Sequence, residues 1–361
     1  MGLLVRSVEM RDFRSFDRRD IDFCEGITVL VGRNASGKTN TVEALQLLTC
    51  GRSFRKPRAA HLVREGASMA RLEGRLEGDG RVIDVSMVAT AEGRKFLLND
   101  KPCRPASLEG TLLSVLFNPD DLLLVKGSAS ARRAEVDDFA GQANQGYRKV
   151  LRAYTRAVEQ RNRLLKEEVP DLALLDAWDE SIALGGATLL LHRVRLFERL
   201  RAHIEGIYGE ISGSEQLGCE YVCSVCDDPR GMTREELRDT YLECLALGRA
   251  DDLRRQQTLV GPHRDDVRFL LDGRDARDFG SQGQQRSVVL AWKMAEVALA
   301  EEIVGSKPLL LLDDVMSELD ERRREAMTGF VKAGMQTVVT TTNLGYFSPE
   351  ALSGAEVVQY G

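Results

Sequence analysis

The sequence predicts an α/β fold in which the two ends of the chain form one domain and the middle forms a helical lobe. Strand-like segments fill the first hundred residues, helical periodicity dominates residues 130–256, and strand-like segments return after residue 258. We therefore expect residues 1–128 and 257–361 to form a head domain, with residues 129–256 inserted as the lobe.

The N-terminal part begins with short strands. Leu3–Val8, a segment near Ile21 and Ile27–Val31 have strand character, whereas Thr39–Leu48 has helical character. Residues 68–99 alternate between apolar and polar positions, with glycine and aspartate between the runs. This alternation predicts a β-meander.

An apolar stripe at helical spacing runs through the middle of the chain, and Gly185-Gly186 interrupts it. Core packing explains such a stripe more simply than a ligand site does. The stripe consists of Leu175, Trp178, Ile182, Leu189, Leu196, Leu200, Ile204, Ile207 and Ile211.

The C-terminal part returns to an α/β pattern. Val267–Leu271 and a second strand flank Asp272-Gly273, a strong hairpin-turn signal. Gln284–Val304 is helical. Leu309–Asp313 and Gln336–Thr341 are apolar enough to be buried strands of a parallel sheet.

Composition and charge are those of an ordinary soluble globular protein, with 43% hydrophobic residues, 29% charged residues and a net charge of −6. No apolar run approaches the ~20 residues that span a bilayer. The N-terminus has no cleavable signal pattern, and Arg6 stands where a myristoylation motif has Ser or Thr. We expect a cytoplasmic protein without a membrane partner.

Seven cysteines, an odd and scattered set, argue against a disulfide framework. Cys219, Cys223 and Cys226 have a spacing that can hold an iron–sulfur cluster. Their segment alternates like a half-buried strand, and cysteine is often a small buried hydrophobe. We favour the packing interpretation over a metal site.

The segment from Gly32 to Thr39 matches the P-loop pattern G-x4-G-K-[ST] and lies between a predicted strand and a predicted helix. Gly32 and Gly37 allow the backbone N–H groups to turn towards phosphates. Lys38 would neutralise the β- and γ-phosphates of ATP, and the Thr39 hydroxyl would ligate Mg²⁺. The expected nucleotide-binding residues here are Gly32, Arg33, Asn34, Ala35, Ser36, Gly37, Lys38, Thr39 and Asn40.

Two aspartates follow the four leucines of the buried strand, at the end where α/β sheets hold ligands. We expect Asp313 to bind Mg²⁺ and Asp314 to orient or deprotonate the attacking water, with Lys38 as the third catalytic residue. Capping of the next helix is the alternative for such acidic residues, but the P-loop favours catalysis.

The segment Ser281-Gln-Gly-Gln284 precedes a helix, and Ser317-Glu-Leu-Asp320 follows the acidic strand. The Ser281 hydroxyl, the Gly283 amide and the helix N-terminus would together form an anion site, with Gln284 beside it. The segment looks like the signature of ABC-type ATPases, which contacts the γ-phosphate held by a second subunit. This resemblance implies an ABC-type head and an ATP-dependent homodimer.

Within that superfamily the chain resembles the RecF family over most of its length. The motifs that carry the resemblance occur in the same order, and they are Arg11–Phe16, Gly51–Arg55, Phe117–Leu122, Gly261–Asp266, Ser281–Arg286, Leu311–Asp314 and Ser317–Asp320. The resemblance implies that Arg14 lies near the nucleotide. It also implies a role in DNA repair, replication, recombination and the SOS response, with recombinase loading assisted by the mediators RecO and RecR.

Basic residues gather in two segments, residues 51–75 and 148–168. A solvated surface is one interpretation, and a footprint for the phosphate backbone of DNA is the other. The RecF resemblance favours sequence-independent binding of single-stranded and gapped duplex DNA. The expected DNA-binding residues are Arg52, Arg55, Lys56, Arg148, Lys149 and Arg152.

Two departures from the wider ABC pattern predict slow hydrolysis. Asp314 replaces the usual catalytic glutamate, and Thr341-Thr342-Asn343 stands where transporters usually place a histidine. His263 is either a base or a structural residue of its turn.

Two alternatives from other classes remain: an ATPase subunit of a transport or protein-remodelling complex that does not bind DNA, and a small-molecule P-loop kinase.

Overall fold

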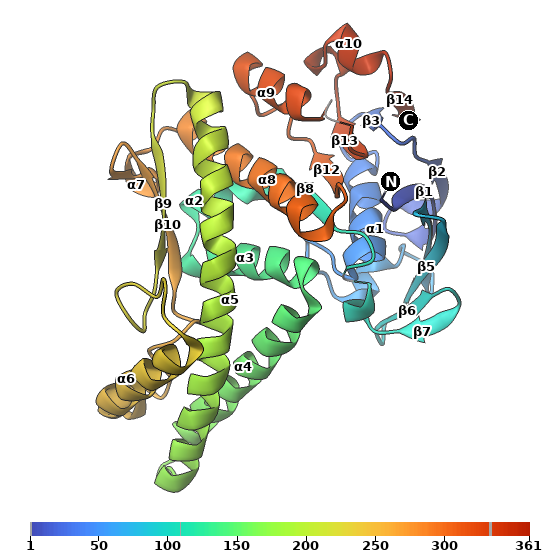
Figure 1. Cartoon of the computed structure of the whole chain (residues 1–361). Helices are drawn as coiled ribbons and strands as arrows, with labels where there is room; N and C mark the ends of the chain where they lie inside the picture. The colour runs from blue at the N-terminus through green and yellow to red at the C-terminus, as the bar shows by residue number, and fades with distance from the viewer. Residues whose placement is uncertain (1, 109, 332–333) are drawn as a thin grey trace. The chain divides into compact units, whose positions relative to one another are not determined.

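The computed structural model describes residues 2–108, 110–331 and 334–361. They divide into two compact units, the first containing the chain up to Asp121 together with Lys293–Gly361, and the second containing Leu122–Trp292. Figure 1 shows the strands of the first unit and the long helices of the second.

The first unit contains an antiparallel sheet with the strand order β2-β1-β4-β5-β6-β7. The sheet confirms the predicted meander, and its first strand is longer than predicted because it continues through the motif at residues 11–16 to a tight hairpin that pairs Phe13 with Phe16. Its strands are β1 (Leu4–Phe13), β2 (Phe16–Asp22), β4 (Ala70–Gly78), β5 (Arg81–Ala89), β6 (Arg94–Leu98) and β7 (Lys101–Cys103).

A parallel sheet with the order β14-β3-β13-β12-β8 completes the first unit. Helix α1 (Lys38–Cys50) is buried on most of its surface because strands of both sheets pack against it. The strands are β3 (Ile27–Gly32), β8 (Ser114–Phe117), β12 (Leu309–Asp313), β13 (Thr337–Thr341) and β14 (Glu356–Tyr360), and the unit also contains the second part of α8 (Gln282–Val304), α9 (Glu321–Val331) and α10 (Pro349–Leu352).

The second unit is built on α5 (Leu172–Ser212), a helix of 41 residues, with α4 and α6 packed along it. Its three-stranded sheet has the order β11-β10-β9. The other elements are α2 (Leu123–Lys126), α3 (Ala129–Ala143), α4 (Gln145–Leu164), β9 (Leu217–Val222), α6 (Arg234–Arg255), β10 (Asp266–Leu271), β11 (Arg274–Asp275), α7 (Ala276–Phe279) and the first part of α8 (Gln282–Val304). Outside these elements, and mostly in the first unit, single 3₁₀ turns occur at Ala59–Leu62, Pro105–Ser107, Pro119–Leu122 and Leu344–Tyr346.

This unit extends beyond the predicted lobe of residues 129–256 at both ends. The reason is strand pairing, since β10 lies after residue 256 and pairs along its whole length with β9, which lies before it. The predicted hairpin at Asp272-Gly273 is confirmed, and both residues have a positive φ, 46° and 78°, as the tight turn requires.

Gly185-Gly186 interrupts the apolar stripe, as the sequence indicates, but α5 is continuous through it, because the glycine pair serves packing inside the helix. A Cβ atom at Gly186 would lie 2.5 Å from Cε1 of Tyr241 and 3.0 Å from Cε2 of Tyr154. Both tyrosines are almost fully buried. The absence of a side chain therefore lets α4 and α6 approach α5.

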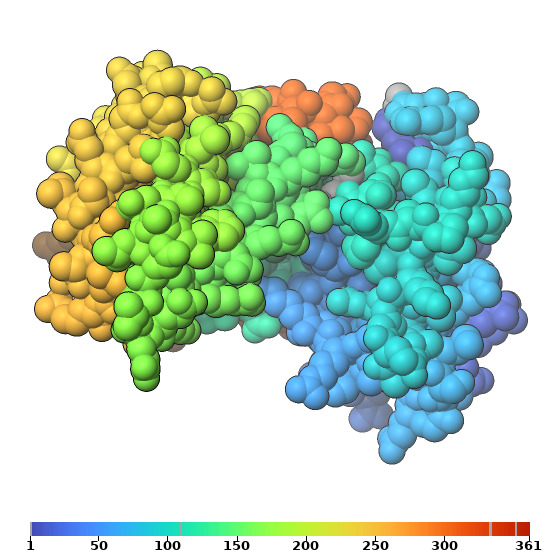
Figure 2. Space-filling view, turned by 90° about the horizontal axis from the view of Figure 1, so that it is seen from below, coloured from blue at the N-terminus to red at the C-terminus, as the bar shows by residue number. Residues whose placement is uncertain are grey.

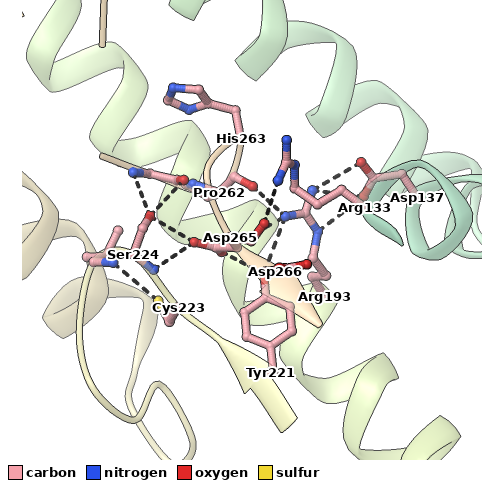
Figure 3. Close-up of polar contacts among 12 residues, drawn as sticks. Arg133, Asp137, Arg193, Tyr221, Cys223, Ser224, Pro262, His263, Asp265 and Asp266 are labelled. Carbon is pink, nitrogen blue, oxygen red and sulfur yellow. Dashed lines mark hydrogen bonds and ion pairs between the residues drawn. The ribbon is translucent and has the colours of Figure 1, made fainter. Parts of the chain in front are cut away.

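The motif Gly261–Asp266 lies in a buried polar network (Figure 3). Arg193, on α5, is 2% exposed, and its Nη2 donates to both carboxylate oxygens of Asp137 at 2.9 and 3.1 Å. Its Nη1 donates to the backbone oxygen of Pro262 at 2.7 Å. A buried guanidinium with partners of this kind ties α3, α5 and the motif together.

Asp265 is the acceptor at the centre of the same network. Its carboxylate accepts from the hydroxyl of Tyr221 at 2.6 Å and from the backbone N–H of Ser224 at 2.8 Å. Its backbone oxygen accepts from Nη1 of Arg133 at 2.6 Å. The network thereby links β9, α3 and the segment before β10.

His263 is a structural residue, which answers the question left open by the sequence. Its Nε2 lies 3.1 Å from the backbone oxygen of Thr258, and its Nδ1 lies 2.7 Å from the hydroxyl of Tyr154. Because the Thr258 oxygen can only accept, Nε2 carries the proton and Nδ1 accepts from the tyrosine. Burial lowers the pKa of His263 from 6.5 to about 4, so the ring is neutral at physiological pH.

We expect Gly186→Ala to destabilise the protein by roughly 1–3 kcal/mol, because the added methyl group overpacks a buried contact with two tyrosines. Gly185→Ala is the matched control, since its Cβ would meet nothing nearer than 3.8 Å. The control should leave stability unchanged or raise it by up to ~1 kcal/mol through helix propensity. Urea unfolding measures both, and equal effects of the two substitutions would contradict this account.

His263 should make the protein less stable in acid. The unfolded chain binds a proton at the ordinary pKa of 6.5 and the folded chain only at about 4, so stability is lost as the pH falls between these values. The full loss amounts to about 3 kcal/mol. In unfolding measured from pH 7.5 to 4.5, His263→Gln should flatten this dependence, whereas the exposed His192→Gln should retain it.

Candidate nucleotide-binding site

The predicted P-loop connects β3 to α1 in the first unit, as its pattern requires. Gly37 has a φ of 100° directly before the first residue of α1, a conformation that favours glycine. A Cβ atom at Gly32 would lie 2.3 Å from the backbone oxygen of Tyr360, so only glycine lets β14 lie against the loop. Arg33, Asn34 and Ala35 form the exposed part of the loop.

Lys38 bends back over this loop. Its Nζ donates to the backbone oxygens of Gly32 and Arg33 at 2.7 and 2.8 Å. Burial lowers the pKa of the Lys38 ammonium, while the carboxylates of Asp314 and Asp313 act in the opposite direction. A cation that has lost much of its hydration at the centre of a P-loop is suited to bind phosphate oxygens.

Asp313, the last residue of β12, joins the P-loop helix to the neighbouring strand. Its Oδ1 accepts from Oγ1 of Thr39 at 2.9 Å and from Oγ1 of Thr340 at 2.8 Å. Burial raises the pKa of this carboxyl, and the two hydroxyl donors partly offset the rise. The sequence therefore predicted the pair of Thr39 and Asp313 correctly as neighbours, but not the contribution of Thr340.

Asp314 has a backbone conformation that non-glycine residues rarely adopt, with a φ of 55°. Its backbone N–H donates to Oγ1 of Thr340 at 2.9 Å, which holds this conformation. Within the described part of the chain, two buried oxygens have no hydrogen-bond partner, Oδ1 of Asp314 and Oγ of Ser36 in the P-loop. Strain and unsatisfied oxygens of this kind concentrate where a ligand binds.

Arg14 is held by α1 through a residue that the sequence analysis did not single out. Glu43 is fully buried, and its carboxylate accepts from Nε and Nη2 of Arg14 at 2.9 and 2.7 Å. Ser53 and Arg55 also donate to it. The available signal in the sequence was a charged residue among the apolar residues of a predicted helix. A carboxylate at such a position is buried, and buried carboxylates need cationic or hydrogen-bonding partners.

The predicted signature belongs to the second unit and forms the N-terminus of α8. The backbone N–H of Ser281 donates to Oε1 of Gln284 at 2.7 Å, and the backbone N–H of Gln284 lies 3.3 Å from Oγ of Ser281. These two contacts form a capping box. Ser281 is exposed and Gly283 is half-buried, so the helix N-terminus faces solvent.

The other predicted residues differ in exposure. Asn40 lies at the start of α1 and donates from Nδ2 to Oγ of Ser15 at 3.0 Å. Asn343 caps the turn Leu344–Tyr346 by accepting from the N–H of Gly345 at 2.8 Å. Thr342 is exposed.

The six basic residues predicted to bind DNA fall into two groups. Arg55 and Lys56 are exposed and Arg52 is half-buried. On α4, Lys149 and Arg152 are exposed, whereas the side chain of Arg148 is 13% exposed and pairs with Asp138. DNA contact by these six residues stays a prediction.

The three cysteines lie on β9 and in the segment that follows it, where Cys223 and Cys226 pack against buried residues of α5 and α6. Cys219 is buried on β9, and the sulfurs of Cys223 and Cys226 lie 3.9 Å apart. Burial raises the pKa of the Cys223 thiol to about 12, which disfavours the thiolate that metals bind. In the described part of the chain no three or more His, Cys, Asp or Glu side chains are grouped to hold a metal ion.

Among the helices of the described residues, none combines the length and apolar character needed to cross a membrane.

Comparisons with known proteins agree with this geometry. The model of the RecF/RecN/SMC N-terminal domain family matches residues 4–356. A DNA replication and repair protein RecF from Heliobacterium modesticaldum is 37% identical, covering 98% of this chain and 96% of the relative. RecF proteins of Symbiobacterium thermophilum and Bacillus subtilis are 40% and 33% identical over 95% and 98% of this chain, and over 92% and 97% of the relatives.

Solved structures show the same fold. Two structures of the recombination mediator protein RecF in the RecFOR pathway, one with ATP and one with ATPrS, match with a TM-score of 0.89 and 31% identity, covering 96% of this chain and 94% of the solved chain. An Smc head domain from Pyrococcus furiosus has a TM-score of 0.56 at 17% identity, covering 94% of this chain and 90% of that chain, and shares the fold alone. The fold is that of an ABC-type ATPase head. The chain belongs to the RecF/RecN/SMC ATPases and, within them, to the RecF family of DNA replication and repair proteins.

Proposed function

We propose that this chain is an ATP-gated DNA clamp of recombinational repair and replication. Two copies bind two ATP molecules with Mg²⁺, close on single-stranded or gapped duplex DNA, and open after slow hydrolysis. The observation that supports this most is the pair of orphaned oxygens on Ser36 and Asp314 in a P-loop site whose lysine is desolvated. Relatives solved with ATP and ATPrS support the choice of nucleotide.

The donor set of the site fits Mg²⁺. The Thr39 hydroxyl and the Asp313 carboxylate are hard oxygen donors in mutual contact, and Asp314 brings an unsatisfied oxygen to the same strand end. Mg²⁺ commonly takes one or two protein ligands and completes its shell with phosphates and waters. We propose that Thr39 and Asp313 hold the ion, which when bound would neutralise charge on the β- and γ-phosphates.

Lys38 and Asp314 would have the two remaining roles, which are phosphate binding and orientation of the attacking water. Lys38 would exchange its two backbone acceptors for phosphate oxygens of ATP. Asp314, with its N–H held by Thr340, would orient the attacking water. Its side chain is one methylene shorter than the usual glutamate, so it reaches that water less well, and we propose that hydrolysis is slow and times the release of DNA.

Ser281 would complete the site of a second copy. It is an exposed hydroxyl at the N-terminus of a 23-residue helix, where the helix dipole favours an anion. The γ-phosphate of an ATP molecule bound by the P-loop of the partner copy would be that anion. ATP would thereby join two heads, each made in this proposal of residues 1–128 and 257–361.

DNA binding would rest on phosphate contacts without base readout. Figure 2 shows α4, in green, at the surface of one face of the second unit. Two of its predicted DNA-binding residues, Lys149 and Arg152, are exposed. The RecFOR pathway in the names of two relatives supports RecO and RecR as partners in recombinase loading, and we propose the cytoplasm as the compartment.

Ser281→Arg should abolish ATP-dependent dimerisation and spare ATP binding. A buried, unpaired guanidinium at the proposed interface should weaken the dimer by roughly a hundredfold or more. Sedimentation velocity with ATP and Mg²⁺ measures the dimer, and a fluorescent ATP analogue measures binding. Ser181→Arg, at an exposed position of α5, is the control and should dimerise normally. Dimers that persist in Ser281→Arg would contradict the assignment.

Replacing Lys149 and Arg152 together by alanine should weaken DNA binding on the order of tenfold and lower the salt slope by roughly 1–2. Fluorescence anisotropy of a labelled gapped duplex, with and without ATP and Mg²⁺, measures both quantities. Replacement of Arg234, which is exposed, and Arg238, which is half-buried, both on α6, is the matched control and should change little. Equally weak binding by the wild type in both nucleotide states would favour the ATPase subunit of a transport or remodelling complex instead.

A further inference from the structure

Three hydrogen bonds connect the end of α5 to the signature at the start of α8. The hydroxyl of Tyr208 donates to Oε2 of Glu215 at 2.9 Å. Oε1 of Glu215 accepts from Nε2 of Gln284 at 2.6 Å, and Oε1 of Gln284 accepts from the backbone N–H of Ser281 at 2.7 Å. All four residues belong to the second unit, so the connection lies within one compact body.

Glu215 determines which way the Gln284 carboxamide points. A backbone N–H can only donate and an ionised carboxylate can only accept. The carboxamide therefore satisfies Ser281 and Glu215 together in one orientation only, with its oxygen towards Ser281 and its nitrogen towards Glu215. In the opposite orientation both contacts would be lost.

The orientation of Gln284 in turn completes the capping box of Ser281. The Ser281 oxygen lies 3.3 Å from the backbone N–H of Gln284 and accepts from it. A serine hydroxyl has one donor besides its acceptor positions. The box thus uses the acceptor side and leaves the hydroxyl proton of Ser281 to donate to an anion.

The turn that carries Glu215 is held on both sides. Oγ of Ser212 donates to the backbone oxygen of Glu215 at 3.0 Å. The backbone N–H of Gln216 donates to Oδ1 of Asp272, and the N–H of Asp272 donates to the oxygen of Gln216, both at 3.0 Å. Tyr208, the anchor on α5, is fully buried. A shift at the end of α5 would therefore reach the Gln284 carboxamide.

The charge of Glu215 is hard to explain otherwise. A carboxylate beside a helix N-terminus that binds phosphate repels its ligand, so electrostatics alone disfavours an acidic residue here. Orienting the Gln284 carboxamide would explain why an acidic residue stands here despite this repulsion.

We propose that Glu215 is a positioning residue of the signature, which orients Ser281 through Gln284 and couples the end of α5 to ATP-dependent dimerisation. This inference rests on the proposed function of Ser281. Glu215 would act through Gln284 and Ser281, and it is not among the residues assigned here to the nucleotide.

The test compares Glu215→Ala with Glu215→Gln. Alanine removes both hydrogen bonds, whereas glutamine can accept from Gln284 with its oxygen and donate to Tyr208 with its nitrogen. In the nucleotide-free protein, hydrogen exchange of the Ser281 amide should be roughly tenfold faster in Glu215→Ala and unchanged in Glu215→Gln. The ATP-dependent dimer should weaken by roughly tenfold only in Glu215→Ala, with the affinity for a fluorescent ATP analogue unchanged.

The glutamine variant keeps the contacts and removes the charge, so its dimer should be as tight as the wild type or tighter. Tyr208→Phe, which removes one link, should lie between the wild type and Glu215→Ala. The control is Glu220→Ala, at an exposed carboxylate on β9 that faces Arg268 at 4.0 Å. It should leave exchange at Ser281 and dimerisation unaltered.

Three outcomes overturn the inference, and each has its own signature. Equal exchange of the Ser281 amide in all variants overturns the positioning role even where ATP dimerises the wild type. A wild type that ATP never dimerises overturns the proposed function and the coupling with it, and the wild-type sedimentation alone identifies that case. Equal dimerisation of Glu215→Ala and Glu215→Gln overturns the orientation role: a shared departure from the wild type would assign the effect to the charge, and two unaltered dimers would leave Glu215 without a role in dimerisation.

Discussion

The buried carboxylate of Asp313 is the contact on which the first unit depends. It accepts from Thr39 at the start of the P-loop helix and from Thr340 on the adjacent strand, so one side chain joins α1, β12 and β13. Parallel pairing brings these strand ends to one edge of the sheet. The same Thr340 holds the backbone of Asp314. Burial raises the pKa of Asp313, and the hydrogen bonds from the hydroxyl groups of Thr340 and Thr39 partly offset this rise. The nucleotide chemistry proposed for this site would therefore depend on the same few atoms that hold the sheet edge together.

The second unit uses buried polar contacts in another way. Arg193 and Asp265 join helices and strands distant in the sequence, and such a network is stable only when every member is satisfied. The signature lies in the same unit, and in the proposed role its serine is oriented through residues of α5 and the following turn. In the proposed function the helical unit would therefore do more than contact DNA, since it also carries the signature that would meet the second nucleotide.

Much of the fold and of the candidate nucleotide site could be predicted because the signals are local. The P-loop pattern, the apolar strand before Asp313, the meander and the hairpin at Asp272-Gly273 each depend on a few consecutive residues, and the structure has all of them. Glu43, Thr340 and Glu215 were missed for one reason. Each acts through a partner far away in the chain, such as Glu43 with Arg14, and no periodicity or spacing marks such a pair. The sequence showed the glycine pair only as a gap in the apolar stripe of α5, and its packing role appears in the structure, where neighbouring rings occupy the space beside Gly186.

Sequence alone determined the family, the P-loop, the acidic strand end and the order of the motifs, because backbone conformation and ligand chemistry restrict these positions to few residue types. Tertiary structure alone decided where the compact units divide, since pairing of β9 with β10 crosses the expected boundary. It also decided the role of His263, whose two ring nitrogens are committed to Tyr154 and Thr258. The physical reason is that burial and hydrogen-bond partners belong to the packed chain, so neither the pKa of a side chain nor its available donors can be read from its neighbours in sequence.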